Sequence, residues 1–238
     1  GLLTASYAAA SLVGAPLMGR LSDQFGRRLI LLLSVAGTFV GFLLLAFAEP
    51  IGHSLASLVG STAINIFVLG VLCLSRSVDG LTGGNITVAQ AYISDITDEK
   101  NRAKGLGLIG AAFGLGFIIG PAVGGLLSKF GYNVPALVAA VLSFLNLISI
   151  YFFLPESLTE ERRIAIREQK QAPFTLKALG VALNRPKIGP LLHVRFFFGL
   201  AFSMFQSIFS LYAAFKLHLA TQTTGYVLAY VGLLSVMV

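Results

Sequence analysis

The feature that most constrains this chain is a succession of apolar runs long enough to cross a bilayer, joined by short charged segments. Residues 1–19 carry no charge and residues 29–48 are strongly apolar. About 20 apolar residues let a helix span the hydrocarbon core. The intervening sequence MGRLSDQFGRR holds four charged residues, namely Arg20, Asp23, Arg27 and Arg28. Gly19 and Gly26 suit a tight reversal there, so the pattern predicts a helical hairpin through a membrane.

The composition supports a membrane protein. Of 238 residues, 56% are hydrophobic and 11% are charged, with a mean hydropathy of +0.85. A soluble domain has about 25% charged residues. The single cysteine, Cys73, excludes an intrachain disulfide, and the three histidines lack metal-ligand spacing. No nucleophile–base pair or phosphate-binding loop is present either, so we expect no enzyme activity, no metal and no cofactor.

The remaining apolar runs predict an all-α, polytopic membrane protein. Proline disfavours a helical residue before it, so Glu49-Pro50 should end the second span, with residues 51–62 at the outer surface. The further spans are expected at residues 63–94, 105–127, 136–154 and 188–214, with another beginning near 223. Ser157 and Glu160 form a capping-box pattern before a charged surface helix at 158–170. Because the chain begins and ends inside apolar runs, we expect it to be a fragment of a longer protein.

The basic residues predict the orientation of the spans. Loops on the side of Arg27 carry 13 Lys and Arg residues, whereas the opposite loops carry 2, Lys129 and Lys216. Basic loops stay in the cytoplasm. We therefore expect residues 20–28, 95–104 and 155–187 to be cytoplasmic, in a bacterial inner membrane. This asymmetry explains the net charge of +7 without a nucleic acid partner. Anionic lipid at the membrane surface would attract the basic loops.

The third span carries a polar stripe. On a helical wheel, its polar and glycine residues fall within an arc of about 100°. The candidate site residues in this stripe are Arg76, Asp79, Gly80, Gly83, Thr87 and Gln90. Lipid cannot satisfy such a stripe, which must face protein or a wet cavity. Two interpretations stay open: the stripe lines a transport cavity, or Arg76 and Asp79 form a buried structural ion pair.

The fourth span is dense in small residues, which fall on two faces of a helix. Gly107, Pro121 and Gly125 lie on one face, and Gly116, Gly120 and Gly124 on the other. Small residues allow close helix packing, and Pro121 favours a bend. The pattern fits either a moving element or plain packing.

Four motifs resemble those of the major facilitator superfamily, in order and spacing. The first is Gly19-x-Leu21-Ser22-Asp23-x-x-Gly26-Arg27-Arg28, which matches the family's helix 2–3 loop pattern G-x-L-(A/S)-D-x-x-G-R-(R/K). Leu72-x-x-x-Arg76-x-x-Asp79-Gly80 resembles the helix 4 pattern L-x-x-x-R-x-x-Q-G, with Asp in place of Gln. Gly107-x8-Gly116-x3-Gly120-Pro121-x2-Gly124-Gly125 is similar to the antiporter-type helix 5 pattern, and Leu154-Pro155-Glu156-Ser157 resembles the end of helix 6.

The resemblance implies helices 2 to 8 of a twelve-helix bundle. Residues 1–154 would then form most of the N-terminal half, 155–187 the cytoplasmic linker, and 188–238 the start of the C-terminal half. The sequence around the fourth span looks most similar to tetracycline-efflux drug:proton antiporters. Gly41 departs from that type, which carries an acidic residue midway along helix 3, and this argues against metal–tetracycline as the substrate.

The resemblance also implies roles for the motif residues. A cytoplasmic latch would use Gly19, Asp23, Gly26, Arg27 and Arg28, together with the helix 4–5 hairpin residues Asp95 and Arg102. Apart from the resemblance, the spacing of Arg76 and Asp79 on one helix face suggests proton coupling, since motion that changes their contact changes the proton affinity of the carboxylate. A fixed structural ion pair is the alternative.

The expected function is export of a small amphipathic compound by alternating access, energised by the proton gradient. Small-molecule substrate, protons and lipid are the expected partners, and a monomer is expected. Proton-coupled uptake on the same scaffold is an alternative, and so is a non-transporting membrane sensor or scaffold.

Overall fold

The computed structural model describes residues 1–161, 163–164, 180–181, 183–186 and 188–237, and these residues form helices and connecting turns without a strand. Among the described residues, five helical stretches are long and apolar enough to cross a membrane, judged by length and composition. They are Leu2–Phe25, Arg27–Ala46, Ile64–Ile96, Glu99–Phe130 and Val134–Phe153. The expectation of an all-α, polytopic membrane fold is confirmed.

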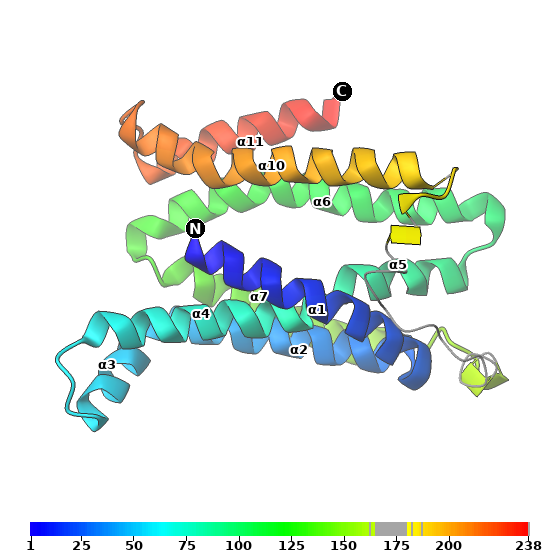
Figure 1. Ribbon diagram of the computed structural model, residues 1–238, viewed down its shortest axis with the longest axis horizontal. Helices are drawn as coiled ribbons and strands as arrows, with labels where there is room; N and C mark the ends of the chain where they lie inside the picture. The colour runs from blue at the N-terminus through cyan, green and yellow to red at the C-terminus, as the bar shows by residue number, and fades with distance from the viewer. Residues whose placement is uncertain (162, 165–179, 182, 187, 238) are drawn as a thin grey trace.

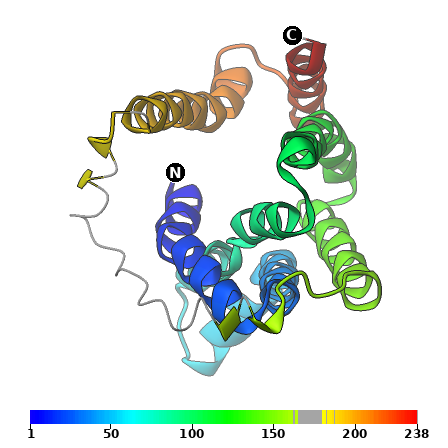
Figure 2. The same cartoon turned by 90° about the vertical axis from the view of Figure 1, so that its right-hand side faces the viewer.

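The helices fall into two groups that run side by side (Figure 1). One group contains α1 (Leu2–Phe25), α2 (Arg27–Ala46), α4 (Ile64–Thr82) and α7 (Val134–Phe153). The other contains α6 (Glu99–Leu127), α10 (Gly189–Phe215) and α11 (Thr221–Met237). The helix α5 (Asn85–Ile96) contacts α1, α2 and α6 and so lies between the groups (Figure 2).

The second span ends earlier than expected. Helix α2 stops at Ala46, and a separate helix, α3 (Ala48–Leu58), begins directly afterwards and diverges from the bundle (Figure 1). Pro50 lies in the first turn of α3, where a missing N–H breaks no helical hydrogen bond. The proline therefore opens a helix here instead of ending one, and residues 51–58 are helical.

The third span is broken near its middle. Helix α4 ends at Thr82 and α5 begins at Asn85, with Gly83 and Gly84 between them. The Ser34 hydroxyl of α2 donates to the Thr82 carbonyl, and the Gly83 N–H turns back to the Gly80 carbonyl at 3.2 Å. A neighbouring side chain thus bonds the terminal carbonyl of α4, and two glycines have the backbone freedom to make the break.

A small apolar core lies near the end of the bundle where α1 turns into α2. Its buried members are Ile30, Leu31, Val88 and Tyr92, with Met18, Leu21, Ala89, Ile150 and Leu154 packed around them. These residues come from α1, α2, α5 and α7, except Leu154, which directly follows α7. The core fixes four segments of the chain beside the candidate site.

The segment after α7 differs from the predicted capping box. A helix begins at Glu160 after Thr159, and the Arg163 N–H donates to the Thr159 carbonyl at 3.0 Å. The Ser157 hydroxyl instead lies 3.5 Å from Asp95 Oδ2. Most of the predicted surface helix at 158–170 lies outside the described residues.

Candidate functional site

The turn between α1 and α2 consists of one residue, Gly26. Helix α1 continues to Phe25 and α2 begins at Arg27, so the charged segment expected as a loop is almost entirely helical. Gly26 has φ +106° and ψ 151°, a conformation that L-residues rarely adopt. A Cβ on Gly26 would also lie 2.5 Å from Glu156 Oε2. The predicted reversal at Gly19 is wrong, because Gly19 is helical and lies inside α1.

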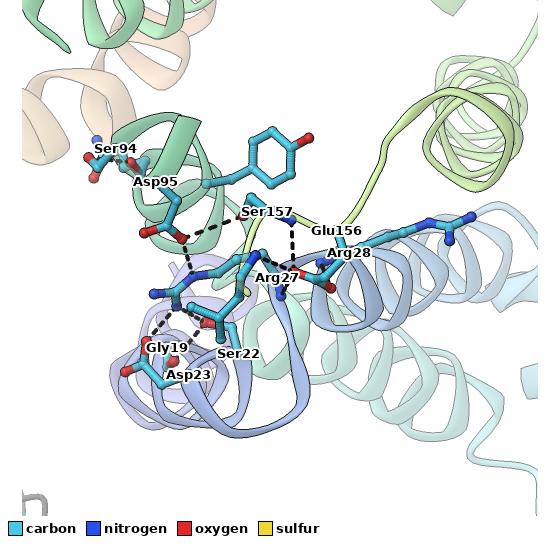
Figure 3. Close-up of polar contacts among 12 residues, drawn as sticks. Gly19, Ser22, Asp23, Arg27, Arg28, Ser94, Asp95, Glu156 and Ser157 are labelled. Atoms are coloured by element: carbon cyan, nitrogen blue, oxygen red, sulfur yellow. Dashed lines mark hydrogen bonds and ion pairs between the residues drawn. The ribbon is translucent and has the colours of Figure 1, made fainter. Parts of the chain in front are cut away.

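The Arg27 side chain joins three helices at this turn (Figure 3). Its NH1 lies 2.6 Å from Asp23 Oδ1 on α1, and its Nε lies 3.1 Å from Asp95 Oδ2 on α5. NH1 also donates to the Ser22 hydroxyl at 2.6 Å. Arg27 is 7% exposed, so its charge is held in the protein by two carboxylates. Removing one partner of such a buried pair is strongly destabilising.

Glu156 closes the same turn from the end of α7. Its carboxylate accepts from the backbone N–H groups of Arg27 at 2.8 Å and Arg28 at 3.1 Å, the first two residues of α2. It also accepts from Ser157 at 3.0 Å and Leu158 at 3.1 Å. A carboxylate at a helix N-terminus satisfies unpaired N–H groups and the helix dipole. Glu156 thereby ties the α7–linker junction to α2.

The structure brings together Asp23, Arg27 and Asp95 of the latch expected from the sequence, and Arg102 lies apart from them. Asp23 pairs with Arg27 of the adjoining turn, and Asp95 supplies the carboxylate from the neighbouring hairpin. Arg102 is an exposed residue of the first turns of α6, whose N-cap is Asp98, with Oδ1 accepting from the Asn101 N–H at 3.0 Å. We call Ser22, Asp23, Arg27, Asp95 and Glu156 the turn cluster.

Arg28 turns away from the turn cluster (Figure 3). Its guanidinium lies over the Tyr151 ring of α7, with Cζ 5.7 Å from the ring centroid. Its NH2 group also donates to the Tyr151 carbonyl. The two consecutive arginines therefore hold different helices, Arg27 joining α1 to α5 and Arg28 joining α2 to α7.

A second polar site lies inside the bundle, on α4. Arg76 NH1 lies 3.3 Å from Asp79 Oδ2, so the ion pair predicted from the i,i+3 spacing is present. The Arg76 and Asp79 side chains are 18% and 11% exposed. The Arg76 Cζ lies 5.2 Å from the centroid of the Phe42 ring, and Thr38 hydrogen-bonds the Asp79 carboxylate. Both of these partners come from α2.

Glycines bring the neighbouring helices close to this ion pair. A Cβ at Gly41 of α2 would lie 3.0 Å from Asp79 Cβ, and one at Gly80 would lie 2.5 Å from the Tyr7 carbonyl of α1. A Cβ at Gly83 would lie 3.2 Å from the Tyr7 hydroxyl. The ion pair therefore sits where α1, α2 and α4 meet. We shall call Tyr7, Thr38, Phe42, Arg76 and Asp79 the membrane cluster.

The predicted polar stripe does not continue unbroken along one helix. Arg76, Asp79 and Gly80 belong to α4, whereas Thr87 and Gln90 belong to α5 beyond the break and are exposed. The break at Gly83–Gly84 separates the two parts. The ion pair is mostly buried by protein, and the exposed polar residues lie nearer the turn cluster.

The glycine-rich helix α6 packs closely against α11 on its Pro121 face. A Cβ at Gly225 of α11 would overlap the Pro121 carbonyl and lie 3.5 Å from Gly125 Cα. Along the same contact, a Cβ at Gly232 would lie 3.1 Å from the Phe117 carbonyl. Among the described residues, nothing lies within 4 Å of a Cβ at four predicted motif positions, Gly107, Gly116, Gly120 and Gly124. Close helix packing, which the small residues were expected to allow, is found on the Pro121 face.

A cavity of about 640 Å³ lies between α6, α10 and α11. Four phenylalanines line it, Phe113, Phe117, Phe202 and Phe205, together with glycines of α6 and α11. Cavities of this size hold small organic ligands. In the part of the chain that the structure describes, no group of three or more His, Cys, Asp and Glu side chains could hold a metal ion.

Sequence reasoning missed Glu156, Ser22, Thr38, Phe42 and Tyr7 as members of these sites. One signal for Glu156 was available: Gly26, which has no side chain, precedes α2, and no acidic residue lies in the first turn of α2. The N–H groups at the start of α2 therefore need an outside acceptor. Thr38, Phe42 and Tyr7 belong to apolar runs, and their side chains enter the site only through helix packing.

The sequence is similar to bacterial drug-resistance proteins. It is 40% identical over 163 residues to the class C tetracycline resistance protein of Escherichia coli, covering 68% of this chain and 37% of that protein. It is 33% identical to the class G tetracycline resistance protein of Vibrio anguillarum over 98% of this chain and 54% of that protein. Multidrug resistance protein 2 of Bacillus subtilis is 31% identical over 91% of this chain and 50% of its own length. The chain thus spans about half the length of these relatives or less.

The fold is similar to that of a solved transporter. The crystal structure of the human organic anion transporter MFSD10 (TETRAN) matches with a TM-score of 0.69, covering 98% of this chain and 54% of that one at 22% identity. A family model described as Major Facilitator Superfamily matches residues 1–238. With the motif spacing, the helical membrane fold and these relatives in agreement, the chain belongs to the Major Facilitator Superfamily.

Proposed function

We propose that the protein exports small amphipathic compounds across a bacterial inner membrane in exchange for protons. The observation that carries this proposal is the ion pair between Arg76 and Asp79 at 3.3 Å, placed inside a membrane-spanning stretch. Ionisable residues at membrane depth are costly and usually serve transport. The similarity to tetracycline and multidrug resistance proteins favours drugs as the cargo class.

The packing of the membrane cluster suggests how helix motion could change proton binding. Asp79 has one charged partner on its own helix, Arg76, and hydrogen-bonding and packing partners on α2. Helix α1 lies against Gly80, one residue from Asp79, where an added Cβ would lie 2.5 Å from the Tyr7 carbonyl oxygen. A shift of α1 or α2 relative to α4 would alter the contacts of Asp79 and therefore its proton affinity.

The turn cluster is the proposed latch of one conformational state. It brings together Arg27, Asp95 and Glu156, one residue from each of three segments predicted to be cytoplasmic, at one end of the bundle. This meeting supports placing all three segments on the same side of the membrane, and their positive charge favours the cytoplasmic side. Opening this side would break the bonds of Arg27 and Glu156.

The phenylalanine-lined cavity is the proposed cargo contact of this part of the protein. It lies between α6 of the N-terminal half and α10 and α11 of the C-terminal half, the two parts that alternating access would move relative to each other. Aromatic walls suit planar apolar groups of a drug. The polar end of an amphipathic cargo would need groups outside this cavity.

A transport assay in cells separates export from uptake. Cells producing the protein should accumulate less of a fluorescent amphipathic drug, and a proton uncoupler should abolish the difference. The variant Phe202→Ala should raise accumulation toward that of cells without the protein, whereas Phe130→Ala, an exposed residue outside the cavity, should not. Greater accumulation with the protein than without it would contradict export and favour a symporter.

A further inference from the structure

A groove of about 330 Å³ runs along the outer face of the bundle between α2 and α7. Aliphatic and aromatic side chains line it: Leu29, Leu32, Leu33, Ala36, Leu147, Ile148, Tyr151 and Phe152. Five of them are exposed, namely Leu29, Leu33, Ile148, Tyr151 and Phe152. These residues belong to helices long and apolar enough to cross a membrane, so we expect the groove to face the hydrocarbon of the bilayer.

The groove lies in the leaflet next to the turn cluster. Its residues come from the first turns of α2, which begins at Arg27, and the last turns of α7, which ends at Phe153. Leu29 to Ala36 rise about 10 Å along the helix, at 1.5 Å per residue. The groove therefore has room for the upper part of an acyl chain, beginning just below the membrane surface.

Arg28 lies at the end of this groove that reaches the membrane surface. Its guanidinium sits over Tyr151, a groove residue, and NH2 donates to the Tyr151 carbonyl. Among the described residues, the buried Nε of Arg28 finds no hydrogen-bond partner. Figure 3 shows the Arg28 side chain extended away from Arg27 and its carboxylates. Arg28 is therefore a cation beside an apolar groove.

Glu156 is the acidic residue nearest to Arg28 in the contacts described. Its carboxylate accepts from the Arg28 backbone N–H at 3.1 Å, and three further backbone N–H groups share its two oxygens. Those bonds hold the carboxylate at the N-terminus of α2, while the Arg28 guanidinium lies over Tyr151. Among the described contacts, Glu156 is thus bound to the Arg28 backbone and not to the Arg28 guanidinium.

We infer that the groove between α2 and α7 binds an anionic phospholipid, with one acyl chain along Leu33 and Ala36 and the phosphate at Arg28. Guanidinium matches phosphate in charge and in donor geometry. Basic pockets between membrane helices on the cytoplasmic side suit anionic headgroups. The bound lipid joins α2 to α7 one residue from the Arg27 contacts. This site is independent of the proposed transport activity.

The absence of tryptophan from the sequence allows a direct test. Phe152→Trp places one fluorophore in the groove, and Phe153→Trp, whose residue is 82% exposed and does not line the groove, is the matched control. The purified protein in detergent is titrated with phosphatidylglycerol or phosphatidylcholine carrying brominated chains, which quench a neighbouring tryptophan. We expect half-maximal quenching of Phe152→Trp at about fivefold less phosphatidylglycerol than phosphatidylcholine, the effect of one arginine near a membrane surface. Phe153→Trp should show no preference.

Two further variants assign the preference to Arg28. Arg28→Gln in the Phe152→Trp protein should remove it, whereas Lys100→Gln, which removes an exposed basic residue of a predicted cytoplasmic segment, should keep it. Ala36→Phe should fill the groove and weaken quenching by both lipids. Equal quenching by the two lipids, an unchanged preference in Arg28→Gln, or its equal loss in Lys100→Gln would overturn the inference. No quenching by either lipid would indicate that protein covers the groove, and would also overturn it.

Discussion

The Glu156 carboxylate accepts a hydrogen bond of 2.8 Å from the backbone N–H of Arg27, 129 residues earlier in the chain. A residue of the helix-to-linker junction therefore caps the helix that follows the Gly26 turn. The turn cluster holds Arg27 from both directions, with the side chain between Asp23 and Asp95 and the backbone against Glu156. The latch proposed for this region follows from that arrangement.

Glu156→Ala should destabilise the protein by about 1–2 kcal/mol, as the loss of a helix cap does. Glu156→Gln keeps an acceptor oxygen but loses the charge at the α2 N-terminus, so its effect should be smaller. The thermal unfolding midpoint in detergent measures both. Glu160→Gln, at a carboxylate with 77% side-chain exposure, is the control and should leave the midpoint unchanged. An equal effect of Glu156→Ala and Glu160→Gln would contradict the capping role.

Gly26→Ala and Gly19→Ala should differ sharply although both glycines belong to one motif. At Gly26, an alanine would adopt φ +106° and meet the Glu156 carboxylate, with a cost of about 2 kcal/mol or more. At Gly19, the new Cβ would meet Thr87 Cγ2 at an ordinary 3.9 Å inside a helix, where alanine is favourable. Unfolding midpoints of the two variants check this. Similar destabilisation by both would indicate that α1 turns at Gly19 as well.

Arg27 and Asp95 should be energetically coupled. Their side chains are 9% and 15% exposed and lie 3.1 Å apart, so each single variant leaves a charge poorly paired. A double-mutant cycle of Arg27→Gln and Asp95→Asn, measured by denaturant unfolding, should give a coupling energy of about 1–3 kcal/mol. The pair Arg163 and Glu160, at 2.7 Å but with 31% and 77% exposure, should couple by less than about 1 kcal/mol. Additive effects of Arg27→Gln and Asp95→Asn would remove Asp95 from the latch.

Gly225→Leu should separate α11 from α6, because its side chain would enter the Pro121 carbonyl. Gly116→Leu adds the same volume at a position with no described neighbour within 4 Å. Gly225→Leu should therefore lower the yield of folded protein and drug export strongly, and Gly116→Leu should retain more of both. Size-exclusion profiles and efflux rates compare them. If Gly116→Leu is as damaging, that face of α6 also packs closely against protein.

Much of the fold follows from apolar run lengths, because a membrane helix must satisfy its own backbone and needs about 20 apolar residues. The i,i+3 spacing likewise placed Arg76 beside Asp79. What the sequence did not reveal depends on distant contacts. The break after Thr82 involves the Ser34 hydroxyl of another helix, and Glu156 meets Arg27 only because α7 ends beside the start of α2. The predicted turn was longer than the observed one, because charged residues indicate only which part of the chain leaves the membrane. The reversal itself needs one residue with a positive φ, Gly26.

The proton-coupling role assigned to Asp79 is the central claim, and drug-induced proton movement in proteoliposomes tests it most directly. Asp79→Asn is close in shape to aspartate and can still accept a hydrogen bond from Thr38, but it cannot release a proton. Glu160→Gln serves as the control for removal of a carboxylate. We expect drug addition to drive proton movement in the unaltered protein and in Glu160→Gln, and none in Asp79→Asn despite its normal insertion into the vesicles. Proton movement at the unaltered rate in Asp79→Asn would contradict the account.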